Sequence, residues 1–226
     1  MQNIFSILSR ASILALSTIA IANATVVIYE TTGAFNCNGL VGCTAVGNVA
    51  TVGGLTLTYQ VQTPTMVNAN PLVSANFGDI VVSGGSSTAV TTLSNLLLNI
   101  TINQSSPYGQ SNGVFSGIIT GALGITSGAS DGFATICFVT PNACASQKEA
   151  ITYSNGTPSV IYTLQTPANP SQGPPANGYT IRATSSNATD ATSFQGSITV
   201  TPEPSSYMML ASGLMGLGAL ARRRKA

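Results

Sequence analysis

Apolar and polar side chains alternate along several segments of this 226-residue chain. In residues 55–61, LTLTYQV, every second residue is Leu, Tyr or Val, and the residues between them are Thr and Gln. Residues 96–103, LLLNITIN, place Leu and Ile at every second position in the same way. A period of two with many β-branched residues is typical of half-buried strands. Because no window of the central region shows sustained helical periodicity, the alternation predicts an all-β fold.

Turn residues separate these segments from further apolar ones. The other expected strands are 26–31, 77–82, 113–120, 133–139, 150–154, 159–164, 179–183 and 195–201. Dipeptides such as Gly53-Gly54, Ser106-Pro107 and Asn155-Gly156 mark turns, and residues 166–177 predict a Pro-rich surface loop. About ten short strands at regular spacing predict an antiparallel β-sandwich or jelly-roll-like body, whose strand order the sequence does not give.

Few residues of this chain are charged. Lys plus Arg is 7, Asp plus Glu is 6, and the charged share is 6%, against about 25% in ordinary soluble domains. Residues 25–201 hold two basic and five acidic residues, a net of three negative charges. Such a body has no means of neutralising a run of phosphates, which excludes nucleic acid as a partner.

The N-terminus has the organisation of a secretory signal. Arg10 precedes an apolar stretch, residues 11–21, and Ala22 and Ala24 are the small residues that signal peptidase requires. We expect a signal peptide at residues 1–24, cleaved after Ala24. A buried N-terminal helix is the alternative.

Export would bring the four cysteines into an oxidising compartment, where disulfides persist. They form two closely spaced pairs, Cys37 with Cys43 and Cys137 with Cys144. Four cysteines allow three connectivities, and we expect local pairing because each pair can close a small loop. A zinc site is the rival interpretation, but neither pair has the Cys-x-x-Cys spacing and the chain has no His. We expect no metal and no cofactor.

One motif resembles a catalytic one. Residues 128–132, GASDG, match the G-x-S-x-G nucleophile elbow, which needs a strand-to-helix turn and a His base. Without His and without a following helix, a turn between two strands is the expected structure. A solvated hairpin tip is expected at Lys148 and Glu149. Turns, rather than a calcium loop, are expected at Asp131 and Asp190, because the repeated acids of such a loop are absent. The sequence therefore predicts a protein that is not an enzyme.

The C-terminal residues combine three ordered features. Pro202-Glu203-Pro204 precedes the uncharged apolar segment 207–221, and Arg222, Arg223, Arg224 and Lys225 follow it. As a helix this segment is roughly 22 Å long, shorter than a ~30 Å hydrocarbon core, although snorkelling arginine stems extend it. We expect a transmembrane helix with its basic tip in the cytoplasm. A buried helix of the sandwich is the alternative.

This C-terminal layout closely resembles the PEP-CTERM sorting signal. The residue before the triplet, often Val in that family, is Thr201 here. Labels derived from ice-binding proteins have also been attached to such tails, and they say nothing about ice. The resemblance implies a Gram-negative host that makes extracellular polysaccharide. It also implies processing by exosortase, a membrane-embedded cysteine protease, so that Pro202, Glu203 and Pro204 are a recognition site in a substrate.

The expected organisation has three parts: a signal peptide (1–24), a β-sandwich body (25–201) and a sorting signal (202–226). The resemblance implies transient anchoring in the inner membrane, then a location at the cell surface or outside the cell. We expect a non-enzymatic surface or matrix protein associated with polysaccharide. The alternative is a carbohydrate-binding or adhesive module, for which exposed aromatic rings would be needed; the candidate platforms are Tyr108, Tyr153, Tyr162 and Tyr179.

Overall fold

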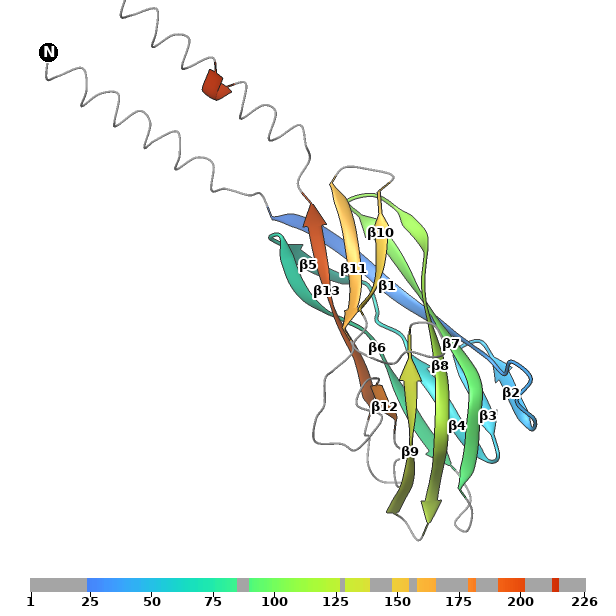
Figure 1. Ribbon diagram of the computed structural model, residues 1–226. Helices are drawn as coiled ribbons and strands as arrows, with labels where there is room; N and C mark the ends of the chain where they lie inside the picture. The colour runs from blue at the N-terminus through green and yellow to red at the C-terminus, as the bar shows by residue number, and fades with distance from the viewer. Residues whose placement is uncertain are drawn as a thin grey trace, which may run out of the picture.

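The computed structural model describes residues 24–84, 90–126, 129–138, 148–154, 158–165, 179–181, 191–201 and 213–215. Almost all of them lie in antiparallel strands that form two sheets (Figure 1). The strands are β1 (Thr25–Asn36), β2 (Cys43–Val46), β3 (Val49–Val52), β4 (Leu55–Gln60), β5 (Thr65–Ala69), β6 (Leu72–Gly84), β7 (Thr91–Ser106), β8 (Gln110–Thr126), β9 (Ala129–Cys137), β10 (Lys148–Tyr153), β11 (Ser159–Gln165), β12 (Tyr179–Ile181) and β13 (Thr192–Thr201). The predicted all-β class is confirmed.

The six-stranded sheet has the order β12-β9-β8-β7-β1-β5, and the seven-stranded sheet has the order β10-β11-β13-β6-β4-β3-β2. Runs of strands joined as hairpins, β2-β3-β4 and β7-β8-β9, stay within one sheet. A jelly roll instead arranges eight strands as two Greek keys. The antiparallel two-sheet expectation therefore holds, whereas the strand order is not that of a simple jelly roll.

Alternation along the strands creates the core between the two sheets. In β4 the side chains of Leu55, Leu57 and Tyr59 are buried, and the residues between them are only partly covered. Aromatic rings meet across the core: Tyr29 of β1 lies 6.0 Å from Phe77 of β6 and 5.8 Å from Tyr162 of β11, measured between ring centroids. Edge-to-face packing of this kind adds stabilisation beyond the burial of apolar area. The aromatic residues thus hold the two sheets face to face.

Three short strands, β2, β3 and β5, were not expected from the sequence. A two-residue turn at Gly47 and Asn48 connects β2 to β3, and Gly53-Gly54 connects β3 to β4. The glycines of these turns have positive φ, 55° at Gly47 and 84° at Gly54, as tight hairpin turns require. Several predicted strands are also longer than expected, because their pairing continues beyond the apolar core segment.

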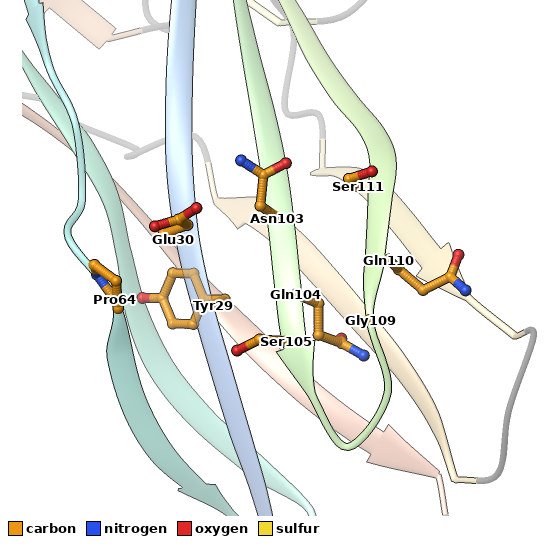
Figure 2. Close-up of a pocket in the computed structure, with 9 residues that line it drawn as sticks. All are labelled: Tyr29, Glu30, Pro64, Asn103, Gln104, Ser105, Gly109, Gln110 and Ser111. Carbon is orange, nitrogen blue, oxygen red and sulfur yellow. The ribbon is translucent and has the colours of Figure 1, made fainter.

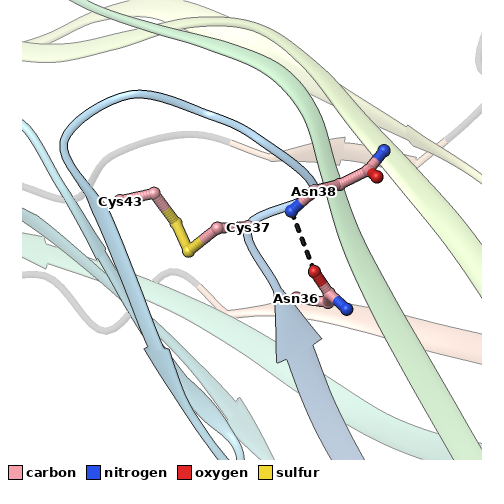
Figure 3. Close-up of a disulfide and its surroundings, with 4 residues drawn as sticks. All are labelled: Asn36, Cys37, Asn38 and Cys43. Carbon is pink, nitrogen blue, oxygen red and sulfur yellow. Dashed lines mark hydrogen bonds between the residues drawn. A yellow bond between two sulfur atoms is a disulfide. The ribbon is translucent and has the colours of Figure 1, made fainter.

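Cys37 and Cys43 form a disulfide, as predicted, with a Cα–Cα distance of 5.7 Å (Figure 3). The bridge closes the loop between β1 and β2. The backbone N–H of Asn38 donates to the Asn36 side-chain oxygen at 2.8 Å, and Asn38 and Gly39 have positive φ. Cys137 is disulfide-bonded as well, whereas its predicted partner Cys144 lies outside the described residues.

The start of β1 and the end of β13 lie at the same end of the molecule (Figure 1). Thr25 pairs with Ala69 of β5, and the Val200 N–H donates to the carbonyl of Pro71 at 2.8 Å. The chain therefore enters and leaves the body at one end.

Residues 213–215 of the tail are helical. Among the described residues, no helix has the length and apolar character needed to cross a membrane.

Candidate functional site

An open pocket of about 430 Å³ lies on the body where β1, β7 and β8 run side by side (Figure 2). Its lining residues are Tyr29, Glu30, Pro64, Asn103, Gln104, Ser105, Gly109, Gln110 and Ser111. Glu30 and Asn103 are direct partners in the pairing of β1 with β7, and their side chains project from neighbouring strands in Figure 2. The register of two strands far apart in sequence thus creates the pocket.

Several lining groups are engaged in bonds within the protein. Tyr162 donates its hydroxyl to the Gln104 side-chain oxygen at 2.8 Å, and the Gln104 amide donates to the Tyr108 carbonyl at 3.0 Å. The Tyr29 hydroxyl donates to the Asn76 carbonyl at 2.8 Å, and burial raises the pKa of Tyr29 to about 12. Tyr29 and Gln104 are the buried members of the pocket lining, and their bonds within the protein give them structural roles.

Glu30, Asn103 and Ser111 are the lining groups best placed to contact a ligand, because their side chains are partly or fully exposed. Together they offer a carboxylate, an amide and a hydroxyl. Such groups form hydrogen bonds to hydroxyl-rich or amide-containing molecules. Within the described part of the chain, no group of three His, Cys, Asp or Glu residues is arranged to hold a metal ion.

The tyrosines that the sequence suggested as sugar platforms lie in the core instead. Tyr153, Tyr162 and Tyr179 are at most 5% exposed. Tyr108 is half-buried, and the carbonyls of Tyr153 and Pro158, 2.7 Å and 3.0 Å away, share the hydrogen of its hydroxyl. The expectation was wrong for Tyr153, Tyr162 and Tyr179, because their rings belong to the hydrophobic core. Three of the four suggested platforms therefore have no exposed ring for a sugar to stack on.

The GASDG segment also differs from its expected structure. Residues 129–132 belong to β9 and pair with β8, where Ser130 lies opposite Ile125 and Asp131 opposite Gly124. They are part of a strand rather than of a turn. A nucleophile elbow needs a helix after the serine, whereas here strand β9 continues to Cys137. Position 128 and Asp190 lie outside the described residues.

Lys148 and Glu149 begin strand β10 rather than forming a solvated tip. Glu149 is half-buried, and its Oε2 atom is buried without a hydrogen-bond partner. Burial raises the pKa of Glu149 from 4.5 to about 7. The expectation of a solvated tip was wrong for Glu149 because the edge strand continues through it.

Most residues of the predicted processing sites lie outside the described part of the chain. These are Ala22 of the signal, Pro202, Glu203 and Pro204 of the triplet, and Arg222, Arg223, Arg224 and Lys225 of the basic tip. Ala24 is described and exposed, directly before β1. At the other end, Thr201 pairs with Ser159 as the last residue of β13, so the triplet follows the folded body without a spacer.

The described residues thus define an all-β protein of two antiparallel sheets, with a polar pocket and a C-terminal segment that continues directly from an interior strand. Residues 200–225 match the family model described as the PEP-CTERM protein-sorting motif, which confirms the resemblance inferred from the sequence. The motif indicates an exported protein that exosortase processes and that is sorted to the cell envelope or surface. No curated protein and no solved structure matches the chain.

Proposed function

We propose that this protein is a non-enzymatic component of the cell surface or extracellular matrix, anchored briefly in the inner membrane of a Gram-negative bacterium and then released or transferred by exosortase. The match of residues 200–225 to the sorting motif carries this proposal. The apolar segment 207–221 and the basic residues after it would form the transient anchor.

Processing can be tested in the native host. Without its exosortase gene, we expect the chain to accumulate with an intact C-terminus in the inner-membrane fraction; with the enzyme, the shortened chain should leave that fraction. Deletion of residues 202–226 should release the body directly. Identical fractionation of all three forms would contradict the proposal.

Association with extracellular polysaccharide is the second part of the proposal, and the pocket supports it. Its exposed groups are neutral or acidic hydrogen-bonding groups, and sugar hydroxyls are suitable partners for them. The buried tyrosines imply that stacking on aromatic rings contributes little, so we expect weak binding that depends on many copies of the protein along one polymer.

A pull-down with the host polysaccharide tests this part. The double variant Glu30→Ala and Asn103→Ala should lose binding, whereas Thr56→Ala, on the outward side of β4 in the other sheet, should retain it. Equal retention of the wild type, the double variant and Thr56→Ala would show that the polysaccharide binds outside the pocket. The absence of any retention would remove polysaccharide from the proposed function and leave the sorting unaffected.

A further inference from the structure

One end of the sandwich, here called the proximal end, comprises residues 25–28, 65–73, 105–108, 158–160 and 198–201. Pairing holds these segments together: Thr25 lies opposite Ala69, Ile28 opposite Ser106, and Ser159 opposite Thr201. The sorting motif leaves the body from this end, because its match begins at Val200, inside β13.

The chain length after β13 keeps the proximal end close to the apolar tail. Only residues 202–206 separate Thr201 from the start of the apolar segment at Tyr207. Fully extended, this stretch spans about 20 Å. Val200 and Thr201 cannot lengthen the connection without breaking β13 away from β11, to which both are paired. While the apolar segment is in a bilayer, the proximal end must therefore remain near the bilayer surface.

The proximal end has the composition expected of a surface that faces lipid headgroups. No residue in its five segments is charged, so contact would desolvate no ion. Three of its apolar side chains are exposed: Val26 by 39%, Met66 by 67% and Leu72 by 60%. The nearest acidic residue along β1, Glu30, follows this segment by two residues and lies about 17 Å from Thr25 at the rise of an extended strand.

These three side chains lie on both outer sides of the sandwich. Val26 precedes the fully buried Val27 and therefore faces outward from the six-stranded sheet, where Met66 lies opposite its neighbour Ile28. Leu72 precedes Val73, which packs against the core, and so faces outward from the seven-stranded sheet. Contact along one flat side of the body would cover only one of the two sets, whereas contact through the end would cover both.

We propose that the proximal end docks on the lipid headgroup surface while the chain is anchored, so that the body stands on its end with Val26, Met66 and Leu72 in the interface. This inference rests on the membrane anchor of the proposed function. Tethering makes such contact effective even though three side chains would bind a membrane weakly by themselves, because the tail keeps the local lipid concentration high. The sorting triplet is then positioned at the membrane surface.

The absence of Trp from the chain provides a direct test. Single variants Met66→Trp and Leu72→Trp place one fluorophore on each outer side of the proximal end. Val46→Trp is the matched control: Val46 is exposed and lies in β2. The carbonyl of its neighbour Gly47 accepts a hydrogen bond from the Phe35 N–H. Phe35 lies ten residues along β1 from Thr25, so Val46 is far from the proximal end. The chains, produced without exosortase so that they keep their tails, are incorporated into phosphatidylcholine vesicles with brominated acyl chains.

We expect a blue shift and loss of Trp emission at positions 66 and 72, and unchanged emission at position 46. Quenching at only one of positions 66 and 72 would show the body lying on one side and would overturn docking through the end. No quenching in chains that float with the vesicles would overturn the docking surface and leave the anchor intact. Chains that fail to float would overturn the anchor itself.

Discussion

At the scale of single residues, Gly33 in the middle of β1 illustrates how tightly the two sheets pack. A Cβ atom at this position would lie 2.2 Å from the ring of Tyr59. That ring is fully buried; its hydroxyl donates to the Phe77 carbonyl and shares a second hydrogen bond, 2.8 Å long, with the Thr31 hydroxyl. We expect Gly33→Ala to lower the free energy of unfolding by about 1–3 kcal/mol, as overpacking does. Urea denaturation of the variant and the wild type measures this change in the free energy of unfolding.

Gly109 provides the control for this substitution. Only the Gln104 carbonyl, at 3.9 Å, comes near a Cβ added at Gly109, so Gly109→Ala should leave the denaturation midpoint almost unchanged. Equal midpoints for the wild type and both variants would contradict the close approach of β1 to Tyr59.

A second residue-scale prediction concerns the pH dependence of stability. Burial raises the pKa of Glu149 to about 7, above the 4.5 of the unfolded chain. Below pH 4.5 the carboxyl is neutral in the folded and the unfolded chain, and its burial does not lower the stability of the fold. Between pH 4.5 and 7 it ionises first in the unfolded chain, so stability falls with rising pH, and above pH 7 the loss is complete.

Glu149→Gln should therefore stabilise the protein at pH 8 by about 1 kcal/mol, a value reduced for solvent screening of this half-buried group. At pH 4 the advantage should disappear. Thermal unfolding of both proteins at the two pH values measures the difference. A gain of the same size at both pH values would show that Glu149 is not the titrating group.

At the scale of elements, the alternating pattern predicted the core-facing strands because burial of every second side chain leaves a clear period of two. Strands β2, β3 and β5 escaped prediction because they are only 4 or 5 residues long. In β2 and β5, exposed apolar side chains such as Val46 and Met66 also obscure the alternation. The pocket escaped for a different reason. Glu30 and Asn103 meet only through the register of β1 with β7, and no local signal encodes that register.

The disulfide loop at the end of β1 is an element whose contribution can be isolated. Cys37 and Cys43 are separated by 6 residues, and closing a loop of this size stabilises a fold by about 2 kcal/mol in the chain-entropy account. The double variant Cys37→Ser and Cys43→Ser should lose that amount in urea denaturation without reductant, with Cys137 still bridged. An unchanged midpoint would mean that the turn glycines alone specify the loop.

At the scale of the whole molecule, the body and the sorting motif share residues. The motif match begins at Val200, which is 5% exposed in β13, and β13 lies between β11 and β6 in the interior of its sheet. The predicted boundary between residues 201 and 202 is therefore the cut closest to the body that still leaves β13 complete. Processing must leave residues up to Thr201 in place if the released body is to stay folded.

Two truncations test this boundary. A chain ending at Thr201 should keep the melting temperature of the full protein, because every described contact of β13 is retained. A chain ending at Ser197 loses the buried side chains of Ile198 and Val200 together with their pairing to β11, which should cost about 4 kcal/mol or more. Such a loss would leave many domains of this size largely unfolded. Circular dichroism during heating distinguishes the two chains, and equal melting would place the end of the folded body before Ser197.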